Sequence, residues 1–464
     1  MYVEEAVAQQ IVDQIGFGKF NLRAILVGAL CSLDTAFSMI SLGFVISVAA
    51  CDFQMNTIEK GRLNAAPMLG MVIGSTMWGY VADLKGRKPA LLASVALQVL
   101  SDFSAAVIPS YTVFVTLKVF SGIGFAGQLS AVYPFVGEFQ PTKCRHQVLS
   151  CMELFWSFGI IGVSLLAWLI IPMKIEIHAL GVVIGSWNVF VMLSTLPGVF
   201  AFLWLLTMPD TPKYLAESGK REEMLRVLSR MYVENTGNTA QQFREQLAFS
   251  PSLSISQLVS KSEVSTGVPT DGNNLAKSDQ SKLGELLNNS GKQMKALLTR
   301  PHNKRIAATS IIIFCMSSTY YSLMTWFPEL FQRFAAFEQA FPNESANICG
   351  VSNKLTNQSS NFQSMPDPYG CDTELATSVY VDNVVLGASC IPFAIIVPLT
   401  VHYVGYRFYL LLTASVSCAV TFGFFFVVNS TQNLILSCIF EAFTSLCTTI
   451  VFCILVDLFP TTLR

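Results

Sequence analysis

Residues 79–88 read Gly79-Tyr-Val-Ala-Asp83-Leu-Lys-Gly86-Arg87-Lys88, and this short charged stretch separates two long apolar runs. The run before it covers 63–82, and the run after it covers 90–109. Each run is close to the roughly 20 apolar residues that a helix needs to cross the hydrocarbon core of a bilayer. The pattern therefore predicts two membrane-spanning helices joined by a tight polar loop.

The same alternation of long apolar runs and short charged loops continues along the whole chain. Of its 464 residues, 52% are hydrophobic and only 13% are charged, whereas soluble globular proteins carry about 25% charged residues. This composition excludes an ordinary soluble enzyme, a disordered chain and a nucleic-acid binder. Backbone amides in lipid must be paired within the segment, and barrel strands would alternate polar and apolar residues, so the runs are predicted to be helices. We expect an all-α membrane protein with ten spans, at 22–48, 63–82, 90–109, 112–137, 148–171, 183–207, 306–329, 379–400, 408–428 and 433–457.

The lysines and arginines predict the orientation, because they gather on the cytosolic side of membrane proteins. A cytosolic N-terminus leaves Lys174 in a short outer loop, with Lys60 and Arg62 near one border. It places most basic residues inside, together with the basic segment 211–305: Lys19, Arg23, Lys85, Arg87, Lys88, Lys143, Arg145 and Arg407.

The segment 208–305 divides the spans into two groups, six in 1–207 and four in 306–464. Its first part, 211–232, carries charge on one side and leucines on the other, which predicts an amphipathic helix on the bundle or the membrane surface. Residues 250–292 are rich in Ser, Asn, Gly and Lys, so we expect a flexible linker there.

The second long connector, 331–378, is expected outside. It contains two N-glycosylation sequons, at Asn343 and Asn357, and two cysteines, Cys349 and Cys371. A polar loop in an oxidising compartment favours a disulfide between these cysteines. The alternatives are two free thiols or a pairing that involves Cys51.

An internal repeat relates the two groups of spans. Asp83-Leu-Lys-Gly-Arg-Lys has a degenerate copy in His402-Tyr-Val-Gly-Tyr-Arg407, 319 residues later. Glu138-Phe-Gln-Pro-Thr-Lys-Cys-Arg145 has a copy at the same offset, Asp457-Leu-Phe-Pro-Thr-Thr-Leu-Arg464. Two pairs at one offset predict duplicated halves, as in repeat-built transporters. The two spans that follow Arg145 have no counterpart after Arg464, so the second half is expected to lack two helices.

These motifs carry a family resemblance. Residues 79–88 resemble the loop 2–3 signature of the major facilitator superfamily, and Lys118-Val-Phe-Ser-Gly122-Ile-Gly124 is similar to its fourth-helix motif. Pro209-Asp-Thr-Pro-Lys-Tyr-Leu215 and the Glu138…Arg145 segment resemble the sugar-porter and organic-ion branch. Tyr320-Tyr-Ser-Leu-Met-Thr-Trp-Phe-Pro-Glu329 is similar to the synaptic vesicle glycoprotein 2 and SVOP-like group, in an invertebrate-like form.

The resemblance implies a cytosolic gate at the loop motifs. Asp83 is expected to cap the neighbouring helix, and Arg87 to pair with an acid across the loop. The alternative is a positive-inside loop without a further role. The residues assigned to this gate are Gly79, Asp83, Gly86, Arg87, Glu138, Arg145, Asp457 and Arg464.

The resemblance also implies a central cavity lined by spans one, four, seven and ten. Ionisable residues are costly inside a bilayer, so Asp34, Lys118 and Glu441 become candidates for that path. Asp34 and Lys118 are expected to neutralise each other until a cation or proton competes for Asp34; the alternative is a purely structural pair. Glu153 and Asp102 are assigned local packing roles.

Aromatic residues add a possible wall for a cation, by cation–π contact. The residues are Trp156, Tyr320, Tyr321 and Trp326. The alternative is an interfacial belt, which suits Trp326 best.

Other signals in the sequence are set aside. Gly122-Ile-Gly-Phe-Ala-Gly127 lies in an apolar run without a preceding strand, so it predicts close helix packing and not a dinucleotide site. No P-loop or metal-ligand spacing occurs in the sequence, so we expect neither an enzyme nor a cofactor or metal.

We expect a monomeric secondary transporter of a small organic solute, cationic or zwitterionic, with protons as a candidate coupling ion, in the plasma membrane or a vesicle membrane. The alternative is a membrane binding or trafficking protein of the vesicle-glycoprotein type, with little or no transport, or an inactive truncated product.

Overall fold

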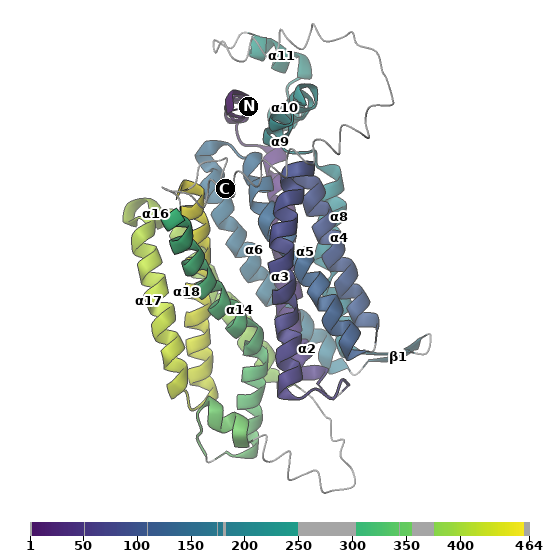
Figure 1. Ribbon diagram of the computed structural model, residues 1–464, viewed down its shortest axis with the longest axis vertical. Helices are drawn as coiled ribbons and strands as arrows, with labels where there is room; N and C mark the ends of the chain where they lie inside the picture. The colour runs from purple at the N-terminus through teal and green to yellow at the C-terminus, as the bar shows by residue number, and fades with distance from the viewer. Residues whose placement is uncertain are drawn as a thin grey trace.

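The structure, a computed structural model, describes residues 2–50, 52–108, 110–173, 175–179, 182–248, 303–342, 344–354 and 375–458. Long helices run side by side between two ends of a bundle (Figure 1). We call the end that carries α1 (Tyr2–Ile15), α9 (Pro212–Glu217) and α10 (Arg221–Thr236) the cap end. The opposite end, which carries the turn between α2 and α3, is the far end.

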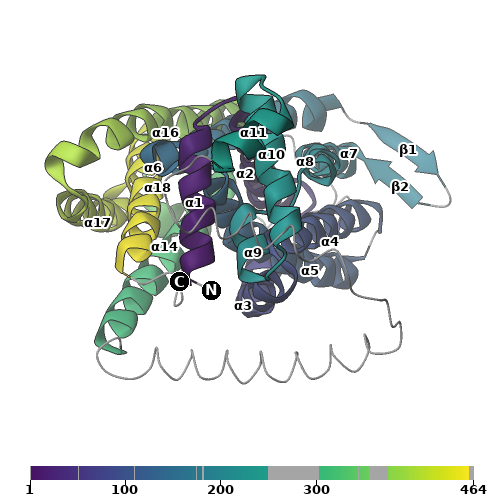
Figure 2. The ribbon, with the colours of Figure 1, turned by 90° about the horizontal axis from the view of Figure 1, so that it is seen from above.

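The described residues fall into a first segment, 2–248, and a second segment, 303–458. Figure 2, which looks along the bundle, shows the helices of the second segment beside those of the first. The long helices of the first segment are α2 (Lys19–Val48), α3 (Thr57–Lys85), α4 (Arg87–Val107), α5 (Tyr111–Glu138), α6 (Thr142–Ile170), α7 (Ser186–Ser194) and α8 (Leu196–Thr207). Those of the second are α14 (Asn303–Ala340), α16 (Thr377–Val404), α17 (Tyr406–Gly423) and α18 (Ser430–Leu458).

Eight helical stretches in the described residues are long and apolar enough to cross a membrane. The stretch at Ser186–Thr207 contains a break at Thr195, just before Pro197 at the start of α8. Helices α3 and α18 are not among the eight, although each has 29 residues and packs inside the same bundle. The apolar runs predicted from the sequence therefore lie mainly in helices, although the run 183–207 begins in a β-strand, Val182–Gly185, and is broken at Thr195.

A small hairpin departs from the all-helical expectation. Strands β1 (Glu176–Ala179) and β2 (Val182–Gly185) pair antiparallel in the connection between α6 and α7. This hairpin lies at the far end (Figure 1).

Glycines set how closely α3 and α5 pack. A Cβ on Gly122 would lie 2.1 Å from the Pro67 carbonyl oxygen, and a Cβ on Gly70 would lie 2.0 Å from the Val119 carbonyl oxygen. Only glycine permits this approach of two backbones. The close packing predicted for the Gly122–Gly127 stretch is confirmed.

The repeated loop motif has a structural counterpart. Gly86 has φ 100° and ψ 166° and precedes α4, while Gly405, 319 residues later, has φ 85° and ψ 147° and precedes α17. Residues with a side chain rarely adopt such positive φ values. The two copies therefore share a backbone turn as well as a sequence pattern.

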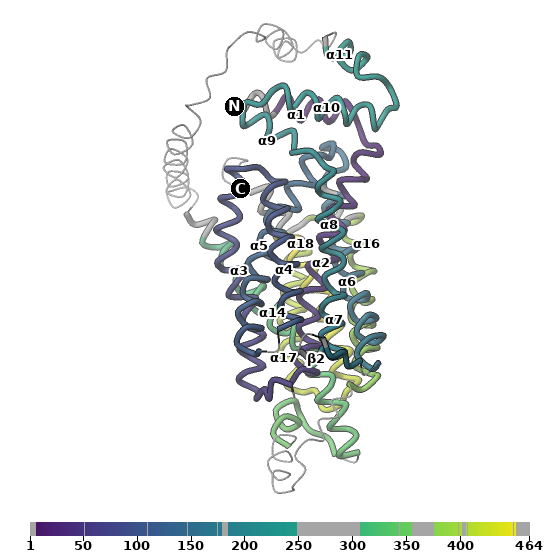
Figure 3. Tube along the Cα trace, turned by 90° about the vertical axis from the view of Figure 1, so that its right-hand side faces the viewer, coloured from purple at the N-terminus to yellow at the C-terminus, as the bar shows by residue number. Residues whose placement is uncertain are grey.

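The cap is formed by segments far apart in sequence. Helices α1 and α10 lie across the bundle at the cap end (Figure 3). Leu215 and Leu228 are buried together with Val7 and Ile11 of α1. The amphipathic helix predicted over 211–232 is thus present as two helices, which are separated by a turn at Gly219 with φ 70°. The predicted linker 250–292 lies outside the described residues.

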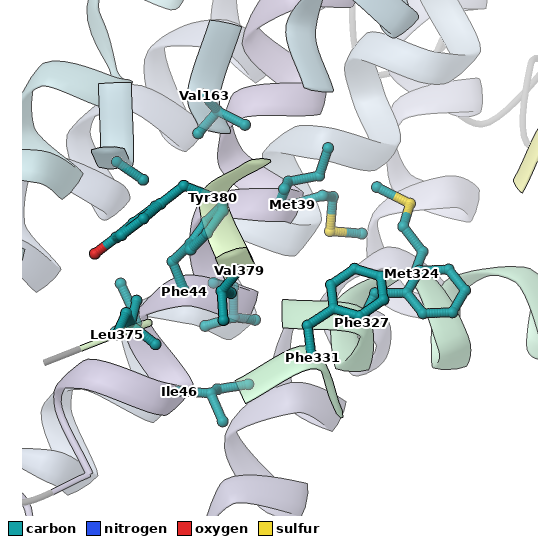
Figure 4. Close-up of a cluster of buried hydrophobic side chains, with 14 of the residues drawn as sticks. Met39, Phe44, Ile46, Val163, Met324, Phe327, Phe331, Leu375, Val379 and Tyr380 are labelled. Atoms are coloured by element: carbon teal, nitrogen blue, oxygen red, sulfur yellow. The ribbon is translucent and has the colours of Figure 1, made fainter. Parts of the chain in front are cut away.

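An aromatic core joins the two segments toward the far end. Phe44 of α2 stacks on Tyr380 of α16, with ring centroids 6.0 Å apart. Figure 4 shows this pair with Met39, Phe327 and other side chains of the same core. The two segments are therefore packed tightly on this side of the bundle.

Candidate functional site

A cavity of about 60 Å³ lies between the two segments. Five helices provide its wall: α2, α5, α6, α14 and α18. None of the described residues that line it is a lysine or an arginine, and most are polar or aromatic. They are Cys31, Ser32, Thr35, Gln128, Leu129, Val132, Tyr133, Glu153, Trp156, Tyr320, Tyr321, Ser445 and Thr448.

A chain of hydrogen bonds crosses one side of this cavity. Trp156 Nε1 of α6 donates to the Tyr320 hydroxyl of α14 at 3.1 Å. That hydroxyl donates to Glu441 Oε1 of α18 at 2.9 Å. Glu441 is fully buried, and its Oε2 has no hydrogen-bond partner among the described residues. The chain fixes both rings and connects a buried carboxyl group to the cavity wall.

A second carboxyl group lines the cavity directly. Glu153 of α6 belongs to the wall and accepts a hydrogen bond from Ser445 Oγ of α18. The sequence assigned Glu153 a local packing role, because the fifth span was expected to be less central. Helix α6 instead turns this residue toward the interface between the segments.

Asp34 lies one layer behind the cavity. Its side chain is buried, and its Oδ2 accepts from Gln98 Nε2 at 2.9 Å and from Gln128 Nε2 at 2.8 Å. Gln128 lines the cavity, whereas Asp34 does not. Gln128 therefore connects Asp34 to the cavity.

The expected pairing of Asp34 with Lys118 is wrong. Lys118 Nζ lies 2.8 Å from Asp102 Oδ1, and both side chains are almost completely buried. Ser38 Oγ donates to the other oxygen of Asp102 at 2.7 Å. Because α4 and α5 pack closely, the lysine meets the acid on the adjacent helix. Lys118 is not among the residues that line the cavity.

The predicted aromatic residues occupy different places. Tyr320, Tyr321 and Trp156 line the cavity, and the Tyr321 ring meets Phe125 edge-on with centroids 6.4 Å apart. Trp326 is only half-buried and is not one of the lining residues.

The residues assigned to the cytosolic gate form a cluster at the cap end. Arg87 Nη1 donates to Asp83 Oδ1 at 2.9 Å, and its Nε lies 3.6 Å from Glu138 Oε1. Arg87 therefore pairs across the loop, as the sequence predicted. Asp83 was expected to cap α4. The N-cap residue of that helix is instead Gly86, and α4 has no side-chain capping hydrogen bond. Gly79 lies open, since an added Cβ would meet nothing within 4 Å.

Arg145 also lies at the cap end, where its Nε donates to the Gly137 carbonyl oxygen at 2.8 Å. Asp457 is in the last turn of α18, and Cys349 is exposed on the surface. The other sequence-predicted positions lie outside the described residues: Arg464, Asn343, Asn357 and Cys371.

A cluster that the sequence did not single out joins the two segments at the far end. Glu329 of α14 accepts from Lys60 Nζ of α3 at 2.7 Å and from Ser47 Oγ of α2 at 2.7 Å. Arg333, one turn further along α14, donates to the same carboxylate at 3.0 Å. We call these four residues the far-end cluster. Glu329 is the last residue of the predicted span 306–329, and only the fold reveals its partners.

Comparisons with known proteins fit this arrangement. The family model described as "Sugar (and other) transporter" matches residues 20–268. Synaptic vesicle glycoprotein 2A of Rattus norvegicus is 28% identical over 366 residues, which cover 76% of this chain and 48% of that protein. Synaptic vesicle glycoprotein 2C of Mus musculus is 26% identical over 367 residues, with 77% and 49% covered. The chain thus spans about half the length of the curated relatives it matches.

Solved structures show the same fold at low sequence identity. The partially occluded inward-open xylose transporter XylE from E. coli aligns with a TM-score of 0.61 at 13% identity, covering 94% of this chain and 87% of that one. Its inward-open form aligns with a TM-score of 0.55 at 15% identity, covering 96% and 84%. The membrane-spanning helices and the family match agree: the chain is an integral, multi-pass membrane protein, and it belongs to the family described as "Sugar (and other) transporter".

Proposed function

We propose that this protein is a secondary transporter that moves a small organic cation, or a zwitterion with a cationic group, by alternating access. The observation that carries the proposal is the charge of the cavity. Glu153 lies in its wall, Glu441 is linked to the wall through Tyr320, and the described lining contains no basic side chain. A cationic ligand would supply the counter-charge that a buried carboxyl group needs in order to stay ionised in a water-poor site.

The aromatic side chains support the same ligand class. Trp156, Tyr320 and Tyr321 lie together in the wall, and the hydrogen-bond chain through Tyr320 holds two of the rings in place. A cation over an aromatic face gains about 0.5–2 kcal/mol, with the larger value where water is excluded.

The contacts between the segments support an inward-facing state. The far-end cluster and the aromatic core both join the segments on the far side. Among the described residues, by contrast, the polar contacts of Arg87 at the cap end stay within the first segment. We infer that the cap end lies in the cytosol, as the basic residues favour, and these contacts then support a transporter that is closed toward the outside.

The organisation follows from the repeat. We propose that 1–207 and 306–464 are related halves, of six and four spans, joined by the cytosolic segment 208–305, with a glycosylated outer loop at 331–378. The shared turn at Gly86 and Gly405 supports this duplication. Protons that compete for Glu441 or Asp34 would couple transport to a proton gradient.

A membrane binding or trafficking role is the second candidate. The similarity to synaptic vesicle glycoproteins 2A and 2C favours it. Such a protein would keep the fold without moving solute at a useful rate. The two candidates differ in one measurable property, the flux of solute.

Uptake by the purified full chain in lipid vesicles tests the proposal. Radiolabelled guanidinium is a suitable probe, because it is small, planar and permanently charged. We expect uptake above that of empty vesicles, and a loss of at least tenfold in Glu153→Gln. Glu176→Gln, the same chemical change on the exposed β1 strand, is the matched control and should leave uptake unchanged. Flux equal to that of empty vesicles would reject the transporter and favour the binding role.

A further inference from the structure

One residue that lines the cavity, Gln128, has an acceptor atom without a partner in the part of the chain that the structure describes. Gln128 is completely buried, and both hydrogens of its amide are used: Nε2 donates to Asp34 Oδ2 and to Gln98 Oε1, each at 2.8 Å. Its Oε1 has no hydrogen-bond partner among the described residues. Buried polar atoms in native proteins are nearly always paired, so an unpaired one at a cavity indicates that something else binds there.

The surrounding groups fix which way this amide points. Turning the amide over would place Gln128 Oε1 against the Asp34 carboxylate and against Gln98 Oε1, which are both acceptors. Gln98 cannot turn in compensation, because its own Nε2 donates to Asp34 at 2.9 Å. The carboxylate thus orients both amides, and the carbonyl oxygen of Gln128, a residue that lines the cavity, is left without a partner in the described part of the chain.

Asp34 itself has little freedom to move. It lies against Gly198 of α8, where an added Cβ would stand 2.4 Å from Asp34 Oδ1. The missing side chain at Gly198 therefore gives this carboxylate its room. Asp34 thus packs against Gly198 and accepts hydrogen bonds from Gln98 and Gln128.

We propose that the carbonyl oxygen of Gln128 is part of the substrate site and accepts a hydrogen bond from an N–H group of the cation. Asp34 is the residue that positions the Gln128 amide. The inference rests on the proposed function and narrows its ligand class. A protonated amine or a guanidinium group carries N–H donors and satisfies this oxygen. A quaternary ammonium ion has the same charge but no N–H, so it leaves the oxygen unpaired and binds less tightly.

The test compares guanidinium with tetramethylammonium on the purified full chain. Each ion is titrated while the thermal unfolding of the protein is followed, which gives an apparent Kd for each. Wild type should bind guanidinium more tightly. Gln128→Met keeps the size of the side chain and removes the acceptor, so guanidinium affinity should fall roughly three- to tenfold, with tetramethylammonium unchanged.

Two further variants test whether Asp34 orients the Gln128 amide or only stabilises the fold. Asp34→Asn can both donate and accept, so it no longer fixes the amide, and the preference for guanidinium should fall toward the value of Gln128→Met. Ser121→Ala, a buried change on the same helix that does not line the cavity, should keep the wild-type preference. If Asp34 only stabilises the fold, Asp34→Asn would lower the melting temperature without changing the ratio of the Kd values for guanidinium and tetramethylammonium.

The outcomes distinguish the two proposals. Stabilisation of wild type by neither ion overturns the proposed function, and this inference with it. Binding of both ions with a preference that Gln128→Met leaves intact overturns the inference alone, and means that water satisfies the oxygen. If Gln128→Met does not fold, an unchanged preference in Asp34→Asn contradicts the positioning role.

Discussion

Removal of Lys60 from the far-end cluster should open the transporter toward the far side. Lys60 Nζ lies 2.7 Å from Glu329 Oε1, with side chains only 15% and 5% exposed, and this pair joins α3 to α14 across the two segments. Lys60→Met removes that link. It leaves the Glu329 carboxylate with Arg333 and Ser47, so no buried charge is left without a partner.

The size of the effect follows from one lost hydrogen bond between charged groups. Such a bond contributes about 1.5–3 kcal/mol, so its loss shifts the equilibrium toward the far-open state by roughly 10- to 150-fold. The lower value is the better guide, because Lys60 keeps some contact with solvent that offsets the loss.

Cys31 reports this shift, because it lines the cavity. In a chain that keeps Cys31 as its only cysteine, a membrane-impermeant thiol reagent is added on the far-end side of sealed cells. The labelling rate is proportional to the fraction of molecules open to that side, so Lys60→Met should raise it at least tenfold.

Arg333→Met is the matched control. It breaks an ion pair with the same carboxylate, but Arg333 and Glu329 lie one turn apart on a single helix and do not link the segments. Labelling should stay close to wild type. Equal labelling in wild type and Lys60→Met, or an equal rise in both variants, would refute the assignment of this cluster as the far-side closure.

Three further predictions concern stability. Lys118→Met should strongly lower the melting temperature in detergent, because it leaves Asp102 buried without a counter-charge, at a cost of about 3–5 kcal/mol. The double variant Lys118→Met/Asp102→Asn should recover most of this stability. A double variant as unstable as Lys118→Met would contradict the pairing. Burial opposes ionisation of Glu234 in the cap, but bonds from two arginines hold its pKa below the ordinary value of 4.5. Glu234→Gln should therefore lower the local stability of α10 at pH 7 by less than about 1 kcal/mol, which is measured as faster hydrogen exchange. The difference between variant and wild type should vanish as the pH falls through the lowered pKa of Glu234. A difference that persists in acid would show that the charge of Glu234 is not its cause. Gly86→Ala and Gly405→Ala each place a side chain on a residue with positive φ, which costs about 1–3 kcal/mol. Gly86→Ala should lower the melting temperature more, because its Cβ would also lie 2.7 Å from the Tyr214 ring. An equal decrease in both variants would argue against that contact.

The helices could be predicted because a bilayer leaves little choice. Each long apolar run must pair its own backbone, so its sequence is enough to assign it as helix. The break at Thr195 and the β1–β2 hairpin were missed because they depend on local geometry that hydropathy does not record.

The partners of buried charges could not be predicted in the same way. Whether Lys118 meets Asp34 or Asp102 depends on the rotation of α5 relative to α2 and α4. Close contacts at glycines such as Gly124, whose added Cβ would lie 2.7 Å from the Ser94 carbonyl oxygen, set that rotation. No single-sequence pattern contains this information.

The same limit explains the cavity. Tyr320 and Tyr321 were assigned to a substrate cavity because the family resemblance implies that the seventh span lines one, and both residues line this cavity. Gln128 and Glu153 also interrupt apolar spans, but so do other polar residues that the structure buries elsewhere, such as Gln98. Only the packing of α6 and α5 against the second segment separates residues that face the cavity from those that do not.

The most direct test of the central claim, that the cavity selects positive charge, compares guanidinium with urea. The two molecules have nearly the same planar shape and N–H donors, and they differ in charge. Competition against labelled guanidinium uptake by the full chain in vesicles should be strong for unlabelled guanidinium and at least tenfold weaker for urea, and Glu153→Gln should reduce that difference. Equal competition by urea and guanidinium would show that the carboxylates do not select the substrate, and would contradict the account.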